Sequence, residues 1–387
     1  MLRVIFSVGV RIPGEGMGNH AYYLVAGLDR HHLLARVFVM QAAGTGIDPA
    51  KITTGYMIEK IAYRLAHYTH LDQYVLRDNL FDGWVARQLS KATIFYGWTH
   101  HALWSLKKAK RLGMITVLER ANSHPLTYTR LLEAEYKKRG MRAEVYHPLI
   151  LKKQRKEIQE TDYIAVTSTF TKQSLLENGI AESRILLTPL GVDTNHYVPG
   201  ACARAGHIPR ADEVFRVLYL GQLSLRKGIS YLLEAWSKLQ LKHAQLLLVG
   251  DVVADMQGIL QEHLKCNDTI MVLPHTPDPV STYQQASVCI LPTLEDGFGL
   301  VVLEAMSCGV PVIITDHTGA KDCVRPNQDG FLIPPYSVDA IADTLRFCYA
   351  HQDQMAAMGR HARQQAEQFP WTRYQDGIVT HLKTIAE

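Results

Sequence analysis

The sequence of 387 residues lacks features that mark several classes of protein. It holds no uninterrupted run of the ~18 apolar residues that a membrane-spanning helix needs. The apolar run at residues 4–10 leads into glycines and is too short for the apolar part of a signal peptide. We therefore interpret this run as a strand and expect no spanning segment.

Cysteine is scarce, and none of its six occurrences forms a C-x-x-C pair. This pattern argues against a zinc site and against a disulfide framework, and it favours a reducing, cytoplasmic compartment. All of the cysteines lie in the second half of the chain: Cys202, Cys266, Cys289, Cys308, Cys323 and Cys348.

Two glycine-rich loops lack the fingerprints of common nucleotide-binding enzymes. The first, at residues 14–18, has the spacing G-x-G-x-G and does not meet the G-x-G-x-x-G pattern of dinucleotide oxidoreductases. The second, at residues 221–228, lacks the G-x-x-x-x-G-K-[ST] order of nucleoside triphosphatases. Backbone amides beside Gly16 and Gly18 could still approach a phosphate at the start of a helix.

Charge is divided unevenly along the chain. Residues 1–200 hold 26 Lys and Arg against 17 Asp and Glu, which is +9, whereas residues 201–387 hold 15 against 20, which is −5. The segment from Lys107 to Lys156 alone has 14 basic and 4 acidic residues. It could face phosphates or an anionic membrane, or it could be a set of solvated helix faces. Because no nucleic-acid-binding module is recognisable, we expect no nucleic acid partner.

Short β-branched apolar runs alternate with segments of helical period, which is typical of an α/β protein with parallel sheets. The first half contains expected strands at residues 2–10, 35–41, 92–96, 114–118, 163–166 and 185–188. After a polar stretch at 198–209, further strands are expected at residues 215–220, 245–249, 270–273, 288–291, 311–315 and 330–333. The clearest helices are expected at residues 18–28, 230–239, 301–308 and 372–385. We therefore expect two Rossmann-like domains, at residues 1–195 and 196–368, and a last helix within 369–387.

The loops after the strands are the candidate sites, because ligands of open parallel sheets bind at the carboxyl ends of the strands. Arg226 and Lys227 precede a glycine at a helix start, where two cations suit a diphosphate or are simply solvated. After the strand at 114–118, the loop at residues 119–125 carries charged and polar residues, including His124. A lone histidine is more often structural than catalytic, but this one follows a strand.

The loop at residues 293–300 places Asp296 eight residues before Glu304, with glycines and a helix start between them. Carboxylates accept hydrogen bonds from neighbouring hydroxyls, as on a ribose or another sugar. The amides of residues 298–301 would point at phosphate or sugar oxygens. Alternatively, the acids only stabilise the start of the helix.

These motifs together, in this order and at these separations, resemble glycosyltransferase family 4, a group of GT-B nucleotide-sugar glycosyltransferases. The resemblance covers nearly the whole chain and is strongest in the second half. It rests on the segments P-L-G-V-D at 189–193, G…R-K-G at 221–228 and P…E-D-G-F-G-L…E-A-M…G-V-P-V-I at 292–313.

The resemblance implies two Rossmann-like domains with parallel sheets facing across a cleft. Residues 1–195 would form the acceptor-side domain and residues 196–368 the nucleotide-sugar donor domain, and the last helix would cross back to the first domain. It also implies a retaining transferase without a metal or another cofactor, and no D-x-D metal motif is evident at the site. The donor would be a nucleoside-diphosphate sugar, and the acceptor a glycan or a lipid-linked molecule. The basic segment would then suit peripheral contact with the inner face of a membrane.

By motif position, four residues would take part in catalysis. Lys227 would neutralise the donor diphosphate, Glu304 would hold the ribose, Asp296 would hold the transferred sugar, and His124 would lie near the donor sugar and the acceptor. The implied donor-binding residues are Gly16, Gly18, Gly221, Gln222, Arg226, His275, Glu295, Gly297, Phe298, Gly299, Leu300 and Val301.

Two positions depart from the family pattern. Asp296 stands where a glutamate is usual, and Gln222 stands where an arginine is common. Glu295 could compensate for the shorter aspartate, and Arg226 could supply the missing cation. A sugar-nucleotide epimerase of the same fold and a non-catalytic sugar-nucleotide-binding subunit remain alternative hypotheses.

Overall fold

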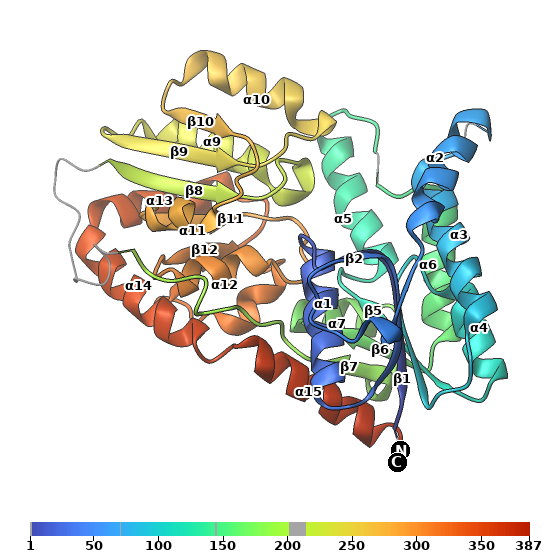
Figure 1. Ribbon diagram of the computed structural model, residues 1–387. Coiled ribbons are helices and arrows are strands. Elements are labelled where there is room, and N and C mark those ends of the chain that lie inside the picture. The colour runs from blue at the N-terminus through green and yellow to red at the C-terminus, as the bar shows by residue number, and fades with distance from the viewer. Residues whose placement is uncertain (1, 70, 144, 201–213) are drawn as a thin grey trace.

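The computed structural model describes residues 2–69, 71–143, 145–200 and 214–387 (Figure 1). Cys202 and residues 201–209 of the expected linker lie outside the described residues. The other five cysteines are free thiols. None of the helices in the described ranges has the length and apolar character needed to cross a membrane.

The chain forms two parallel sheets, and in each the strand order reverses beside the sheet's first strand. The first sheet has the order β3-β2-β1-β4-β5-β6-β7 and the second has the order β10-β9-β8-β11-β12-β13. The strands of the first sheet are β1 (Val4–Ile12), β2 (Leu34–Ala42), β3 (Ile52–Thr54), β4 (Ile94–Trp98), β5 (Ile115–Arg120), β6 (Tyr163–Val166) and β7 (Ile185–Leu187). Those of the second are β8 (Phe215–Leu220), β9 (Ala244–Val249), β10 (Ile270–Leu273), β11 (Val288–Leu291), β12 (Val312–Thr315) and β13 (Gly330–Ile333).

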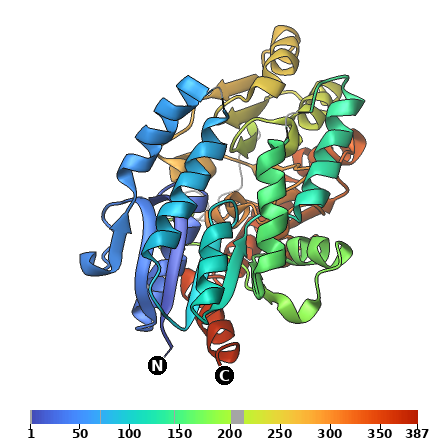
Figure 2. The same cartoon turned by 90° about the vertical axis from the view of Figure 1, so that its right-hand side faces the viewer.

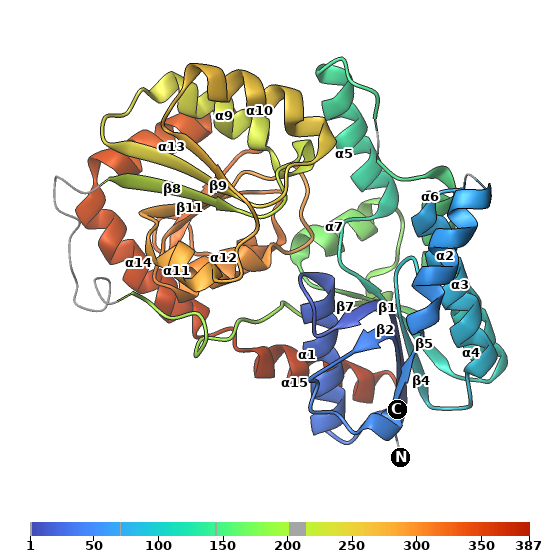
Figure 3. The same ribbon diagram turned by 45° about the horizontal axis from the view of Figure 1, so that its top comes forward.

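Helices cover both faces of each sheet (Figures 1 and 3). On the first sheet, α1 and α15 lie on one face, and α2, α3, α4 and α6 lie on the other (Figure 1). The first set of helices is α1 (Met17–Arg30), α2 (Tyr56–Thr69), α3 (Gln73–Gln88), α4 (Leu103–Arg111), α5 (Pro125–Lys138), α6 (Pro148–Glu160) and α7 (Thr169–Glu177). The second set is α9 (Ile229–Leu239), α10 (Ala254–Cys266), α11 (Pro279–Gln284), α12 (Leu300–Ser307), α13 (Val338–Ala350), α14 (Gln352–Ala366) and α15 (Trp371–Thr384). Short 3-10 turns are η1 (Pro49–Lys51), η2 (Glu182–Arg184), η3 (Leu225–Lys227) and η4 (Gly319–Cys323).

The central strands are buried on both faces, which explains why they appear in the sequence as continuous apolar runs rather than alternating ones. Five expected strands have the predicted bounds: β6, β8, β10, β11 and β13. The three-residue edge strand β3 was not predicted, because a run that short has no readable period.

The strand β5 is longer than predicted. Glu119 and Arg120, which we expected in the loop after it, are its last two residues and are buried. The guanidinium of Arg120 donates to the carbonyl of Ser123 and to the side chains of Thr99 and Gln154. Arg120 therefore fixes the loop that follows β5 from inside the domain, and it is not free to contact a ligand.

The last helix, α15, packs on α1 of the first sheet (Figure 3). The rings of Trp371 and Tyr23 stack with centroids 4.0 Å apart. Tyr374 and His20 share a buried hydrogen bond of 2.7 Å. The amide of Gln375 donates to the carbonyl of Tyr23 at 3.0 Å. The chain thus returns to its first domain after completing the second sheet.

We predict that Gly27→Ala destabilises the protein, because a Cβ at this position of α1 would lie 2.7 Å from the Cβ of Gln375 in α15. Overpacking of this kind typically costs about 1–3 kcal/mol. The matched control is Gly258→Ala in α10, where a Cβ would have no neighbour within 4 Å and helix propensity favours alanine. Urea unfolding should show a lower midpoint for the first variant and an equal or higher one for the second. Equal stability of Gly27→Ala and the wild type would contradict the packing described for α15.

Candidate functional site

The loops at the carboxyl ends of the two sheets meet one another. The backbone amide and hydroxyl of Ser123, after β5, both donate to the Glu295 carboxylate, after β11, at 2.9 Å. On the other side, His275 of the second domain lies 3.6 Å from Glu15 in the first glycine loop. Since strand order reverses between β1 and β4 and between β8 and β11, these loops lie at the usual ligand positions of both sheets.

The loop after β8 packs closely on the loop after β11. Gly228 has a φ of 70°, and a Cβ there would lie 1.9 Å from the carbonyl oxygen of Pro292. Only glycine permits that approach. As a result, Lys227 forms an ion pair with Asp296, and Arg226 donates to the carbonyl of Glu295 at 2.8 Å. Residues 69 positions apart in the sequence thus form one charged cluster.

This charged cluster is largely withdrawn from solvent. Burial lowers the pKa of Lys227, and the Asp296 charge opposes that effect. Burial opposes the charge of Asp296 too, but Lys227 and Arg226 outweigh it and lower the pKa of that carboxyl. The Asp296 carboxylate is therefore ionised at neutral pH beside two basic side chains. An arrangement of this kind attracts a bound anion to the cations and leaves the carboxylate to accept hydrogen bonds.

Glu304 lies in α12, one turn beyond the helix start. Its carboxylate accepts hydrogen bonds from the hydroxyls of Tyr283, at 2.9 Å, and of Tyr197. Burial raises the pKa of Glu304, and the two tyrosine hydroxyls act against that rise. These tyrosines, which the sequence did not point to, hold the carboxylate in one orientation at the site.

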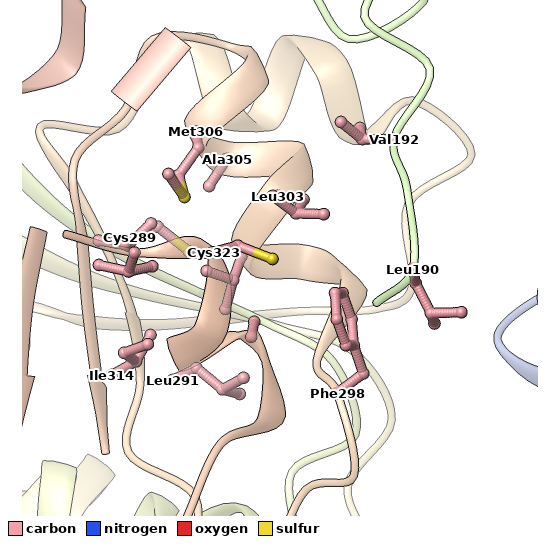
Figure 4. Close-up of a cluster of buried hydrophobic side chains, with 14 of the residues drawn as sticks. Leu190, Val192, Cys289, Leu291, Phe298, Leu303, Ala305, Met306, Ile314 and Cys323 are labelled. Atoms are coloured by element: carbon pink, nitrogen blue, oxygen red, sulfur yellow. The ribbon is translucent and has the colours of Figure 1, made fainter. Parts of the chain in front are cut away.

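The start of α12 is fixed by the core of the second domain. Phe298, Leu303 and Met306 face the same buried cluster as Leu291 and Ile314 of the sheet (Figure 4). Gly299 begins the helix with a φ of 85°. The amides of Leu300 and Val301 belong to the first turn, where N–H groups lack partners within the helix and are suited to an anion.

The first glycine loop borders an open cavity of about 500 Å³ between β1 and α1. Gly16 has a φ of 49° and no atom near the position of a Cβ, so it exposes backbone to this space. At Gly18, a Cβ would lie 2.5 Å from the carbonyl oxygen of Arg11. In the second domain, Gly221 has a φ of 140° and Gln222 is exposed, with its carbonyl bonded to the Tyr219 hydroxyl at 2.7 Å.

Two expected donor-binding residues, Glu295 and Gly297, take part in the contact between the domains. Glu295 is fully buried and bonds Ser123 through one oxygen, while its other oxygen lies 3.3 Å from Arg226. It is therefore not available to compensate for the shorter arm of Asp296. At Gly297, a Cβ would lie 1.7 Å from the carbonyl oxygen of Ala121, so this glycine allows close contact between the two loops. The carbonyl of Gly297 accepts from the Ser168 hydroxyl at 2.6 Å.

His124 also has a structural role. Its Nδ1 accepts from the amide of Leu126 at 3.3 Å, which makes it the N-cap of α5. Burial lowers the pKa of His124 to about 4, with the Arg120 charge acting in the same direction. The imidazole is thus neutral at pH 7 with its proton on Nε2, and it is a hydrogen-bond donor rather than a general acid.

The charged groups of the described residues include no set of three or more His, Cys, Asp or Glu side chains that could hold a metal ion.

Residues 207–365 match the family described as "Glycosyl transferases group 1". The capsular polysaccharide biosynthesis glycosyltransferase CapM of Staphylococcus aureus is 25% identical over 269 residues, which are 64% of this chain and 70% of that protein. The D-inositol 3-phosphate glycosyltransferase of Paenarthrobacter aurescens is 27% identical over 221 residues, which are 54% of each chain. This chain therefore matches about half the length of that relative.

Among solved structures, HepE of Anabaena in complex with UDP and glucose aligns with a TM-score of 0.70 and 17% identity, over 99% of this chain and 100% of that chain. The chain has the GT-B fold. The sequence relatives support a glycosyltransferase enzyme. The predicted fold class, two Rossmann-like units with parallel sheets, is thereby confirmed.

We predict that Gly297→Ala separates the two loops and impairs turnover while the protein remains folded. Displacement of reacting groups by about 1 Å can cost on the order of 100-fold in rate, and the inserted Cβ would have to move the Ala121 carbonyl by more than that. Sugar transfer should fall by this order, and small-angle scattering should show a larger radius of gyration. Gly258→Ala serves as the control. Full activity of Gly297→Ala would show that the contact is dispensable.

Proposed function

We propose that this enzyme is a retaining, metal-independent glycosyltransferase that moves a sugar from a nucleoside diphosphate to a glycan or lipid-linked acceptor. The observation that carries the proposal is the meeting of Lys227, Asp296, Glu304 and the first-turn amides of α12 at one edge of the second sheet. Cations and amides suit a diphosphate, whereas the two carboxylates suit the hydroxyls of a ribose and a sugar. The first glycine loop lies opposite, next to His275.

In this proposal Lys227 changes partners when the donor binds. The ammonium leaves Asp296 for the diphosphate, and Asp296 then accepts hydrogen bonds from the transferred sugar. Glu304, already oriented by Tyr283 and Tyr197, accepts hydrogen bonds from the ribose hydroxyls. Since Glu295 is engaged with Ser123, the short side chain of Asp296 itself sets the fit to the donor sugar.

The proposed reaction proceeds on one face of the sugar. The bond between the anomeric carbon and the diphosphate oxygen breaks, and its electron pair stays on that oxygen. The acceptor hydroxyl attacks the anomeric carbon from the same face and passes its proton to the leaving phosphate. Lys227 and the α12 amides stabilise the charge that develops on the diphosphate. A covalent sugar adduct trapped on a side chain would contradict this mechanism.

The names of the relatives guide the choice of substrates to test. CapM is named for capsular polysaccharide biosynthesis, and HepE was solved with UDP and glucose. We therefore place uridine diphosphate sugars first in a donor panel and glycan acceptors first in an acceptor panel. An epimerase would turn over a donor without any acceptor, and a binding subunit would bind a donor without turnover.

We predict that Lys227→Ala and Glu304→Gln each lose donor binding, because the first removes the diphosphate cation and the second removes the ribose acceptor. Binding at a ligand concentration 100 times Kd stabilises a protein by about 2.7 kcal/mol, which a thermal shift detects. Lys238→Ala is the matched control, since Lys238 is an exposed lysine of the same domain paired only with Asp339 in the described structure. If both site variants show the same donor-induced thermal shift and the same turnover as the wild type, the proposed donor site is wrong.

Peripheral membrane contact is the second part of the proposal, and only some cations of the basic segment are available for it. Several cations between Lys107 and Lys156 are already committed. Lys153 is buried against Asp82, Lys138 bonds Tyr231 of the second domain, and Lys110 pairs with Asp162. The exposed cations that remain on α6 are Lys152, Arg155 and Lys156.

The helix α2 stands on the same side of the first sheet as α6 (Figure 2). It exposes Met57, Ile61 and Tyr68 beside the exposed cations Lys60 and Arg64. A helix that combines apolar and basic residues on its outer surface suits the boundary of an anionic bilayer. We propose that α2 and the exposed cations of α6 make this contact together.

Vesicles of phosphatidylglycerol mixed with phosphatidylcholine should therefore bind the protein, and added salt should weaken that binding. The combined variant Met57→Ser, Ile61→Ser, Tyr68→Ser should lose most of the bound fraction in flotation. The combined variant Lys152→Gln, Arg155→Gln, Lys156→Gln should bind more weakly and with a smaller salt dependence, because only Lys60 and Arg64 of the proposed surface then remain charged. Equal binding to phosphatidylcholine vesicles, or none to either kind, would remove the membrane from the proposal.

A further inference from the structure

The helix α5 belongs to the first domain, but its second half packs on the second domain. It stands beside α10 and against the turn η3 (Figures 1 and 3). This contact involves the loop after β8 and the helices α9 and α10, so it is separate from the contact at Gly297. The turn η3 carries Arg226 and Lys227, the two cations that we assign to the donor diphosphate. The residues that hold α5 here therefore bear on the donor site.

One carboxylate oxygen connects α5 to this turn. The hydroxyl of Tyr136, in α5, donates at 2.7 Å to Oδ2 of Asp255, in the first turn of α10. The backbone amide of Leu225 donates to the same oxygen at 3.3 Å. Leu225 is the first residue of η3, and its side chain is fully buried, so its amide and its side chain fix the turn together. Arg226 and Lys227 follow directly in the chain.

Asp255 supplies a cap that the turn does not make for itself. Ser224 precedes η3, and serine is favoured at such a position because its hydroxyl can accept from a following amide. Here the Ser224 hydroxyl is buried and has no hydrogen-bond partner among the described residues. The amide of Leu225 is held instead by Asp255, 30 positions along the chain. The position of the turn therefore depends on where α10 presents this carboxylate.

The orientation of the Asp255 carboxylate depends in turn on the first domain. Its other oxygen, Oδ1, is buried and has no hydrogen-bond partner in the part of the chain that the structure describes. The hydroxyl that fixes Oδ2 comes from Tyr136, which is 7% exposed and belongs to α5. A side chain of the first domain thus directs the carboxylate that caps a turn of the second.

The helix that follows the turn is also held from α5. After η3 and one glycine, α9 begins, and Tyr231 in its first turn is 2% exposed. The Tyr231 hydroxyl donates to the Glu135 carboxylate at 2.6 Å and accepts from the Lys138 ammonium at 3.0 Å. Both of these partners belong to α5. The neighbouring residues Glu135 and Tyr136 thus hold the helix after the turn and the start of the turn.

The same helix begins at the other loop of the candidate site. Ser123, which bonds Glu295, is followed by His124, the N-cap of α5. Because a packed helix moves as a rigid element, the contacts at its two ends change together when the domains move. Separation of the domains would take the Tyr136 hydroxyl away from Asp255 and loosen the turn that carries Lys227.

We propose that Tyr136 and Asp255 are positioning residues for the donor cations. Tyr136 orients the Asp255 carboxylate, and this carboxylate holds the turn so that Arg226 and Lys227 face the diphosphate. A diphosphate then binds more tightly while the first domain contacts the turn. The proposal rests on the proposed function, since it takes these cations as the diphosphate site. The hold on the turn, however, needs no donor and can be measured in the free protein.

The first measurement is hydrogen exchange of the full chain without ligand, followed by mass spectrometry over residues 222–230. Tyr136→Phe removes only the hydroxyl, and Asp255→Ala removes the acceptor for the Leu225 amide. Loss of one such hydrogen bond should make exchange in this segment about fivefold faster in each variant. Asp255→Asn should recover most of the wild-type protection, because its amide oxygen can accept both hydrogen bonds.

The second measurement is the affinity for inorganic pyrophosphate by calorimetry, with Lys227→Ala as the variant that should not bind. Tyr136→Phe and Asp255→Ala should each bind pyrophosphate about fivefold more weakly than the wild type, and Asp255→Asn should again recover most of the loss. A purely structural role would lower the yield of folded protein without changing the affinity of that protein. The matched controls are Tyr74→Phe, at an exposed tyrosine of α3, and Glu262→Ala, at an exposed acid of α10.

Three outcomes would overturn the proposal: unchanged exchange in both Tyr136→Phe and Asp255→Ala, unchanged pyrophosphate affinity in both, or no recovery in Asp255→Asn. If Asp255→Ala does not fold, Tyr136→Phe decides the result. The expected exchange rates together with no pyrophosphate binding by the wild type would support the hold on the turn and refute the diphosphate site. Failure of this proposal and failure of the proposed function therefore give different results.

Discussion

Gly297 lies so close to the backbone of Ala121 that any larger residue would force the two domains apart. The contact is reinforced on each side by hydrogen bonds between side chains and backbone, from Ser123 to Glu295 and from Ser168 to the Gly297 carbonyl. Because Asp296 stands between Glu295 and Gly297, it is held at the junction of the domains. The position of the candidate donor site therefore depends on this one close approach.

The electrostatics of the site follow from that position. Lys227 and Asp296 are partly withdrawn from water and pair with each other, and Arg226 lies beside them. Charges removed from water are costly unless they are paired, so the cluster favours a second anion that can replace the carboxylate. The tyrosine hydroxyls on Glu304 show the same principle, since they orient a half-buried carboxylate before any ligand arrives.

The sequence allowed a good prediction of the fold, and the roles that it assigned to site residues remain predictions. Fully buried strands leave continuous apolar runs, and five strands were predicted with the observed bounds. Lys227, Asp296 and Glu304 follow such strands at recognisable spacings and lie together at one sheet edge. The contacts that Glu295 and Gly297 make with the first domain were not predicted, because spacing along one loop carries no information about what packs against it. Tyr197 and Tyr283, which hold Glu304, were missed because they lie in a connection and a helix without a motif.

The order of strands and glycines along the chain by itself determined two parallel sheets and the loops at their carboxyl ends. Local rules suffice for this, since burial selects apolar runs and close turns select glycine. Tertiary structure alone decided which polar groups remain available to bind a ligand. Glu295 and Arg120 make their hydrogen bonds within the protein, whereas no described residue accepts a hydrogen bond from the amides of Leu300 and Val301 at the start of α12. Whether a polar group can bind a ligand depends on the partners that folding gives it, and those partners come from distant parts of the sequence.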